Sequence, residues 1–352
     1  MANVTYLIGA GASAGKRGDH GGIIEGLPCV NELVNSITKI ILLLFGTEIP
    51  KNLEWMNSRL GLNSVKDWEE MRAFLLARFE DLRAKCMENA TIDTYAKKLI
   101  LKGEITSFKY LEQMLTLFFI YVQLENKPDS RYDTFLANVL DRKLHFPENI
   151  RVISWNYDSQ FEIAYYEYNQ EDRLLVGSKK TPSNIQHEIT KINGTATFLR
   201  QDFFPRYRQD FLEKLNNEDG KELYNTYTRD QKKLLELIYL YKLYIADSED
   251  NTDLSFAFDE TVTPSAAILE SIDEIIKKTD ALVVIGYTFP FFNREIDRQI
   301  LKNLNHHAKI YIQDKYPKSV RQSLEAVLTD VQRQVQIVEI ERTEQFYLPP
   351  EL

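Results

Sequence analysis

The chain begins with an apolar segment that breaks into a glycine-spaced turn. Residues 4–8 read Val-Thr-Tyr-Leu-Ile, and residues 9–13 read Gly-Ala-Gly-Ala-Ser. Because glycine has no Cβ and tolerates positive φ, such a turn lets backbone N–H groups approach a pyrophosphate closely. Ala14 stands where the third glycine of a dinucleotide fingerprint would fall. The segment therefore predicts a buried strand followed either by a dinucleotide loop or by a tight turn without a ligand.

Three later segments are also predicted strands with polar or glycine residues at their carboxyl ends. They are 151–158, which ends in Asn-Tyr-Asp, 189–195, which contains Asn-Gly, and 281–290, which opens into Gly-Tyr-Thr. The continuous apolar run at 281–285 is typical of a strand buried on both faces. In an open α/β sheet, ligands bind outside the carboxyl ends of the strands, so we expect these residues at one edge of the sheet.

These four elements, in this order, resemble the Sir2-like (sirtuin-type) NAD-binding family. The family pattern is a Gly-Ala-Gly-Ala-Ser loop, an Asn-x-Asp strand end, a His-Gly element and a Gly-x-Ser or Gly-x-Thr loop. The resemblance covers residues 1–15 and 145–345. It implies an α/β fold, a Rossmann-like doubly wound parallel sheet with large helical insertions, and NAD as the bound substrate.

The resemblance also implies which residues bind NAD. The glycine loop and its serine are expected at the pyrophosphate, and the Gly-x-Thr loop on the adenosine side. An acidic residue at the end of the strand 308–313 is expected either to hold ribose hydroxyls or to cap a helix predicted at 319–328. The expected cofactor-binding residues are Gly9, Ala10, Gly11, Ala12, Ser13, Gly194, Gly286, Thr288 and Asp314.

Three residues are predicted to carry catalysis, namely Asn156, Asp158 and Asn193. Cleavage of the nicotinamide–ribose bond generates an oxocarbenium-like ribose, so the site must hold the ribose and admit water to C1′. We expect Asn156 to position the ribose and the attacking water, with a turn-capping amide as the alternative. Asp158 is expected to order Asn156 and its loop, or to contact the carboxamide of nicotinamide.

Asn193 departs from the family pattern, because it stands where the family has a histidine next to Gly194. An amide can donate and accept hydrogen bonds, but it cannot take up a proton near neutral pH. NAD binding is therefore compatible with this residue, whereas base catalysis is in doubt, whether the asparagine is native or engineered. His187 is an alternative base, or else a solvated loop histidine.

The cysteine content narrows the activity further. Sirtuins that deacylate protein lysines carry a four-cysteine zinc module, but this chain has only Cys29 and Cys86. We therefore expect no metal site. The chain looks instead like the zinc-free branch, whose bacterial members commonly hydrolyse NAD as effectors of antiphage defence. That resemblance implies an NAD glycohydrolase, with a silent NAD or ADP-ribose binding module and an ADP-ribosyltransferase as alternatives.

Composition bears on partners and location. The chain has 352 residues, of which 44% are hydrophobic, and a formal net charge of −9. Dispersed basic residues and negative charge disfavour nucleic acid as a partner. No apolar run approaches the length of about 20 residues that spans a bilayer, and no leader pattern is evident. We expect a cytoplasmic protein that forms homo-oligomers or works beside a sensor or ATPase protein, without contact to a membrane.

The organisation along the chain is predicted from the same patterns. Apolar residues recur at helical spacing in four segments of the early chain, 30–45, 65–87, 92–101 and 106–123. A fifth helix is predicted at 228–246. We therefore expect a Sir2-like core at 1–28, 146–200 and 261–345, a helical insertion at 29–145, and an aromatic-rich, mostly helical second insertion at 201–260.

Overall fold

The computed structural model describes most of the chain in two compact units. The described residues are 2–19, 21–53, 62, 64–169, 176–177, 188–198, 218–242, 252–256, 258, 265–332 and 334–352. Unit 1 comprises 1–29, 126–195 and 253–352, and unit 2 comprises 30–125 and 196–252. The first segment of unit 2 ends at residue 125, whereas the first insertion was predicted to end at 145.

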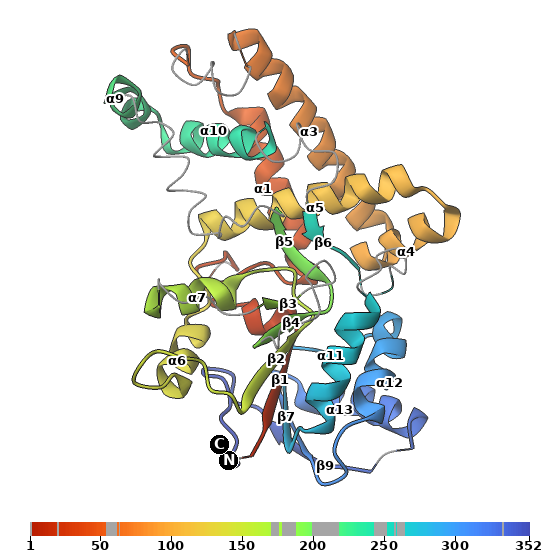
Figure 1. Cartoon of the computed structure of the whole chain (residues 1–352). Coiled ribbons are helices and arrows are strands. Elements are labelled where there is room, and N and C mark those ends of the chain that lie inside the picture. Colours follow the sequence, from red (N-terminus) through yellow and green to blue (C-terminus); the bar gives the residue numbers. More distant parts are fainter. Residues whose placement is uncertain are drawn as a thin grey trace. The chain divides into compact units, whose positions relative to one another are not determined.

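Unit 1 contains a seven-stranded sheet in which every pairing is parallel (Figure 1). Its order is β3-β4-β2-β1-β7-β8-β9. The strands are β1 (Val4–Ile8), β2 (Ile150–Ser154), β3 (Val176–Gly177), β4 (Ile189–Lys191), β7 (Ala281–Ile285), β8 (Lys309–Gln313) and β9 (Gln336–Ile340). The predicted α/β fold class is confirmed.

The strand order contains a switch point between β1 and β7. From β1 the chain builds the sheet outward through β2 and β4, and then returns to the other side of β1 with β7, β8 and β9. Apart from the two-residue β3, this is the strand order of a Rossmann-like doubly wound sheet. In register, Ile8 pairs with Ser154 on one side and with Ile285 on the other. The loops after β1, β2 and β7 therefore start at the same level.

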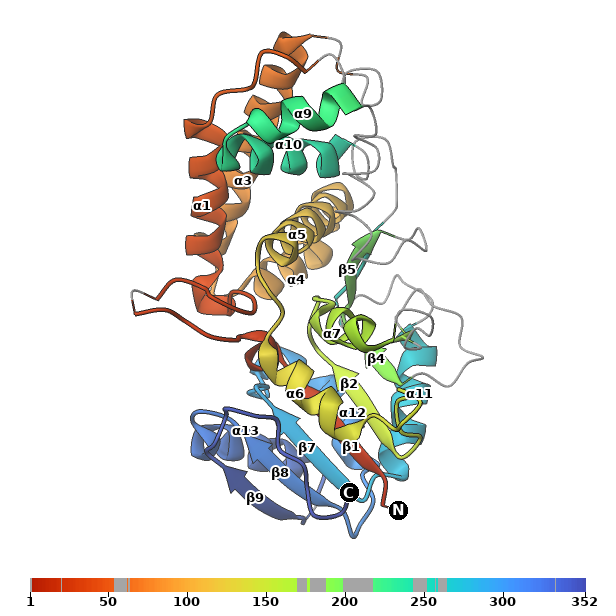
Figure 2. The ribbon, with the colours of Figure 1, turned by 90° about the vertical axis from the view of Figure 1, so that its left-hand side faces the viewer.

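The central strands are apolar on both sides because helices cover both faces of the sheet. Leu7, Leu282 and Val284 pack with α11 (Ser265–Lys277), α12 (Arg294–Lys302) and α13 (Pro317–Asp330). Tyr6 and Val283 pack on the other face with α6 (Ser130–Val139) and α7 (Gln160–Tyr168). Figure 2 shows α6 in front of the strands. This two-sided burial explains why the strands lack an alternating polar pattern.

Unit 2 is mostly helical. Its helices are α1 (Leu33–Gly46), α3 (Val65–Glu88), α4 (Ile92–Lys102), α5 (Ile105–Glu125), α9 (Glu218–Thr226) and α10 (Arg229–Tyr241). α3 begins with a capping box between Ser64 and Asp67, and α4 ends at Gly103 in the left-handed conformation. The helices predicted at 30–45, 65–87, 92–101, 106–123 and 228–246 are confirmed, the last one as Arg229–Tyr241, and residues 243–246 lie outside the described part of the chain.

Three short 3₁₀ helices and a second small sheet complete the described elements. The 3₁₀ helices are η1 (Ala10–Ser13), η2 (Val30–Glu32) and η4 (Phe291–Asn293). The strands β5 (Gly194–Phe198) and β6 (Thr252–Leu254) form a two-stranded sheet. η1 follows β1 directly, so the glycine-spaced segment of the sequence becomes one turn of 3₁₀ helix at the carboxyl edge of the large sheet.

Candidate functional site

The loops after β1 and β7 touch backbone to backbone at the switch point. The N–H of Gly9 donates to Ile285 O at 3.0 Å, and the N–H of Gly11 donates to Gly286 O at 3.0 Å. A Cβ added to Gly11 would lie 2.7 Å from Gly286 Cα. Gly286 has φ +60°, and a Cβ there would lie 2.4 Å from Gly11 Cα. Glycine is required at these positions because any side chain would separate the two loops.

This packing changes the role expected for the glycine loop. The sequence analysis assigned its N–H groups to a pyrophosphate, but those of Gly9 and Gly11 already donate to β7 and its loop. The N–H of Ala12 donates to Gly9 O at 2.8 Å, and Ala10 is exposed at the start of η1. The missing Cβ atoms thus make room for the loop after β7. The sequence alone cannot distinguish this role from making room for a phosphate.

Asn156 joins the loop after β2 to the loop after β1. The side chain is buried, and its Nδ2 donates to Gly9 O at 3.0 Å and to Ser13 Oγ at 3.1 Å. Its own N–H donates to Ser154 Oγ at 3.1 Å. The structure therefore brings Asn156 together with the glycine loop, two elements that are more than 140 residues apart in sequence.

Ser13 links Asn156 to Asp158. The Ser13 hydroxyl donates to Asp158 Oδ1 at 3.1 Å and lies 2.9 Å from the hydroxyl of Tyr132. Asp158 Oδ1 also accepts the N–H of Gln160 at 3.1 Å. Burial raises the pKa of the Asp158 carboxyl, and the nearby Lys191 ammonium opposes that shift. Asp158 thus holds Ser13, which in turn accepts a hydrogen bond from Asn156.

Lys191 is a buried cation next to Asp158. It was not among the residues predicted from the sequence. It ends β4, only 2% of it is exposed, and its Nζ lies 2.9 Å from Glu162 Oε1. The Nζ also donates to the backbone carbonyl of Asp158. Burial raises the pKa of Glu162, and Lys191 again opposes the shift. The available sequence signal was a lysine in the otherwise uncharged segment 189–195.

Arg131 and Asp129 hold the glycine loop from the side of α6, and they too were missed. Arg131 Nη2 donates to Gly11 O at 2.7 Å and pairs with Asp129 Oδ2 at 2.5 Å. Asp129 accepts the N–H of Gly15 at 2.6 Å and caps α6 by accepting the N–H of Arg131. Asp129 is a typical helix-capping residue, but α6 was not predicted as a separate helix, so this signal was not used.

Asn193 lies after β4 and contacts the loop after β2. The side-chain Nδ2 donates to Trp155 O at 3.0 Å, and the backbone carbonyl of Asn193 accepts the N–H of Ser255 at 2.9 Å. Gly194 has φ +64°, and a Cβ there would lie 2.0 Å from Asp253 O. The Asn-Gly pair is therefore a tight turn at the carboxyl edge of the sheet. His187 lies outside the described residues.

An aromatic pair joins the ends of β2 and β7. Trp155 stacks on Tyr287 with ring centroids 5.2 Å apart and an interplanar angle of 8°. The Tyr287 hydroxyl donates to Asp297, at 2.9 Å and 3.0 Å from its two carboxyl oxygens, and accepts from Asn293 Nδ2 at 3.1 Å. Burial raises the pKa of Asp297 to about 8. This carboxyl group is therefore largely protonated at neutral pH.

The two remaining predicted residues lie at the same edge of the sheet but make fewer contacts. Thr288 is exposed in the loop after β7. Asp314 follows β8, and its Oδ1 accepts the N–H of Tyr316 at 2.8 Å, one residue before α13 begins at Pro317. The side chain thus stabilises the turn that leads into α13, which is close to the helix-capping role named as the alternative for Asp314. The helix starts two residues earlier than predicted.

Within the described ranges, no group of three or more His, Cys, Asp or Glu side chains is placed to hold a metal ion. Cys29 and Cys86 are both half-buried. Among the helices that the structure describes, none is both long and apolar enough to cross a bilayer.

No protein-family model matches the chain, and no curated protein matches it.

Proposed function

We propose that this protein is an NAD⁺ glycohydrolase that releases nicotinamide and ADP-ribose, and that it acts as an effector of bacterial antiphage defence. The activity and the biological role both derive from the Sir2-like resemblance of the sequence. One structural observation supports the proposal. Asn156, Ser13 and Asp158 form a hydrogen-bonded chain between the loops after β1 and β2, beside the β1–β7 switch point where dinucleotides bind in doubly wound sheets.

The reaction places defined demands on these residues. Loss of neutral nicotinamide leaves an oxocarbenium-like ribose, water adds at C1′, and a proton is released with ADP-ribose. Because Nδ2 of Asn156 donates to Gly9 and Ser13, we assign its Oδ1 to the ribose hydroxyls or to the attacking water. Asp158 acts as a positioning residue, since it reaches Asn156 only through Ser13.

The buried aromatic pair contains a hydrogen-bond donor next to Asn193. The indole N–H of Trp155 is buried and has no acceptor among the described residues. A buried donor without a partner is unfavourable, and a bound ligand oxygen would satisfy it. We assign this N–H to the nicotinamide half of NAD, because Trp155 follows the same strand as Asn156.

Asn193 favours a second candidate, a silent module that binds NAD or ADP-ribose within a larger assembly. Its amide cannot act as a base, and Nδ2 already donates to Trp155 O. In that case a partner, such as a sensor or ATPase protein, or homo-oligomerisation would supply the function. An ADP-ribosyltransferase would cleave the same bond but transfer the ADP-ribosyl group to a protein or nucleotide.

One experiment separates these activities. The protein is incubated with NAD⁺, and nicotinamide, ADP-ribose and modified protein are then quantified by chromatography and mass spectrometry. Equal amounts of nicotinamide and ADP-ribose support the hydrolase. Nicotinamide with modified protein indicates a transferase, and calorimetric binding of NAD⁺ without any nicotinamide indicates the silent module. The absence of both binding and turnover would contradict the proposal.

A further inference from the structure

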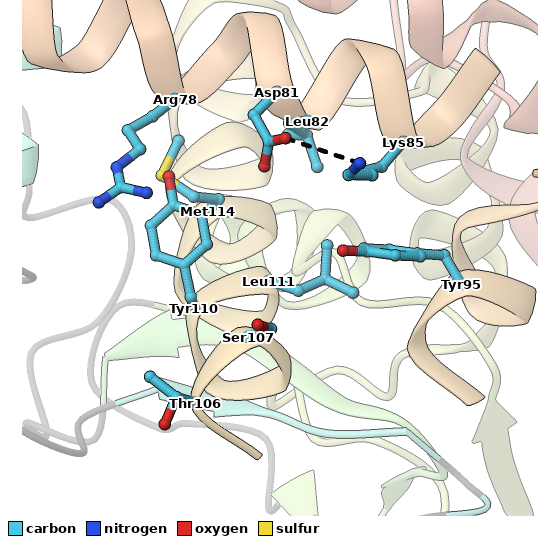
Figure 3. Close-up of a pocket in the computed structure, with 10 residues that line it drawn as sticks. All are labelled: Arg78, Asp81, Leu82, Lys85, Tyr95, Thr106, Ser107, Tyr110, Leu111 and Met114. Carbon is cyan, nitrogen blue, oxygen red and sulfur yellow. Dashed lines mark ion pairs between the residues drawn. The ribbon is translucent and has the colours of Figure 1, made fainter. Parts of the chain in front are cut away.

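A cavity of about 290 Å³ lies among α3, α4 and α5 of unit 2 (Figure 3). α3 contributes two cations and one carboxylate, and α4 and α5 each contribute a tyrosine. The volume is at the lower end of the range typical of small-molecule pockets. The cavity is separate from the proposed NAD site in unit 1, so an inference about it does not depend on the proposed function.

Arg78 is an unpaired cation at this cavity. Its guanidinium carbon lies 4.3 Å from the ring centroid of Tyr110 and 4.8 Å from that of Phe74. Among the described residues, it forms no ion pair and no hydrogen bond. Stacking occupies the flat face of a guanidinium and leaves its N–H edge free, and that edge matches a carboxylate or phosphate. Arg78 is therefore a preformed anion-binding group.

The other cation of the lining is already neutralised. Lys85 Nζ lies 3.9 Å from Asp81 Oδ1 and 3.4 Å from Glu88 Oε2. Figure 3 shows Lys85 and Asp81 directed toward each other on α3. The unbalanced positive charge of the cavity thus resides on Arg78.

Tyr110 adds a second unpaired group. Its hydroxyl is buried and has no hydrogen-bond partner in the described part of the chain. Burial raises the pKa of this hydroxyl, so it remains an O–H donor at neutral pH. In Figure 3 the hydroxyl lies on the side of the cavity where Arg78 and Asp81 project from α3. A buried donor of this kind requires an acceptor.

We propose that this cavity binds a small anion carried on a planar ring, that is, an aromatic carboxylate or an aromatic phosphate. Both unpaired groups, the Arg78 guanidinium and the Tyr110 hydroxyl, are donors, so the atoms that satisfy them must be acceptors. The adjacent positive charge selects an anion. The ring of the ligand lies against Tyr95 and the apolar side chains of Leu111 and Met114, which line the same cavity.

The test uses fluorinated probes and the full chain. Binding of 4-fluorobenzoate and 4-fluorophenyl phosphate is measured by ¹⁹F NMR titration, with 4-fluorobenzamide as the neutral probe of similar shape. We expect at least one anion to bind tighter than the amide by about tenfold or more. The anion that binds more tightly shows whether the cavity prefers a carboxylate or a phosphate.

Three variants locate the binding. Arg78→Gln should weaken the preferred anion by about tenfold, and Tyr110→Phe, which keeps the ring under Arg78, by about threefold. Arg83→Gln is the matched control, because Arg83 is on α3 but does not line the cavity. Asn156→Ala in unit 1 should leave the affinity unchanged. Thermal unfolding of each variant verifies that it is folded.

Several outcomes would overturn the proposal. These are failure of both anions to bind the native chain, equal affinity for the neutral amide, and unchanged affinity in a folded Arg78→Gln protein. Loss of binding in Asn156→Ala would place the probes in unit 1 and would overturn it as well. None of these results bears on NAD turnover, so the two proposals fail separately.

Discussion

The switch point of unit 1 and the cavity of unit 2 differ in how their polar groups are paired. Beside the switch point, in the loops after β1 and β2, the Asn156 amide, the Ser13 hydroxyl and the Asp158 carboxyl are hydrogen-bonded to one another or to backbone. In the cavity, the Arg78 guanidinium and the Tyr110 hydroxyl have no polar partner among the described residues. A paired site must exchange existing hydrogen bonds for those of a ligand, whereas an unpaired site only gains them.

This difference separates two kinds of evidence for function. The switch point is identified by topology and by residue types, and its geometry is held rigidly by glycine packing. The cavity is identified by unsatisfied groups, which no pattern in the sequence reveals. Substitutions in unit 1 can show whether the two loops at the switch point separate easily and whether the residues beside them act in catalysis.

The largest effect is expected where the two loops touch. Gly286→Ala places a Cβ 2.4 Å from Gly11 backbone at φ +60°, and we expect it to lower the free energy of unfolding by about 3 kcal/mol or more. Urea unfolding followed by circular dichroism measures this. Gly22→Ala is the control, since a Cβ there has no atom within 4 Å. Equal stability of the two variants would show that the loops can separate easily, as an open site would.

The second prediction concerns Asn156. Asn156→Ala should reduce nicotinamide release by about a hundredfold or more, the scale for loss of a positioned catalytic group. Initial rates at saturating NAD⁺ measure the effect, and thermal unfolding reports the cost of losing two hydrogen bonds. Asn138→Ala, an exposed site on α6, is the control. Near-normal cleavage by a folded Asn156→Ala protein would leave Asn156 as a residue that only joins two loops.

The third prediction uses the buried carboxyl of Asp297, whose folded-state pKa of about 8 exceeds its unfolded value. The folded state then binds the proton more tightly, so the free energy of unfolding should fall as pH rises from about 4 to about 8. We expect a slope of about 1 kcal/mol per pH unit between pH 6 and 8. Asp297→Asn should remove it, which urea unfolding at several pH values would detect.

Asp330→Asn is the matched control for this slope. Arg294 and Arg298 contact Asp330 and lower the pKa of its carboxyl, so its contribution is lost only as pH falls below about 4. The slope between pH 6 and 8 should therefore survive in that variant. An unchanged slope in Asp297→Asn would mean that Asp297 is ionised in the folded protein and that the aromatic pair sits in a wetter environment.

The smallest effect is expected at residue 193. Asn193→His introduces a base where the Sir2-like pattern has a histidine, and we expect nicotinamide release to rise by about tenfold or more, with the gain appearing as pH passes about 6.5. A pH–rate profile of both proteins measures this. Asn193→Gln controls for side-chain length without adding a base. A native protein that is fast, and that slows in Asn193→His, would show that the amide belongs to a working site.

The sequence predicted the fold and most helices correctly because local periodicity and buried strands dominate them. The segments 4–8 and 281–285 are apolar throughout, and both are central strands buried on two faces. The predicted candidate residues all come after parallel strands, so the topology alone places them at one edge of the sheet. Their roles in binding and catalysis stay predictions.

The apolar and glycine patterns of the sequence alone predicted the central strands, the helices α1, α3, α4, α5 and α10, and the edge at which the candidate residues lie. The doubly wound arrangement was implied by the Sir2-like resemblance. Only the tertiary structure showed that the glycines let the loops after β1 and β7 touch, that Lys191 is buried against Glu162, and that Arg78 forms no ion pair with any described residue. These features depend on contacts between residues far apart in sequence. No local pattern encodes such contacts.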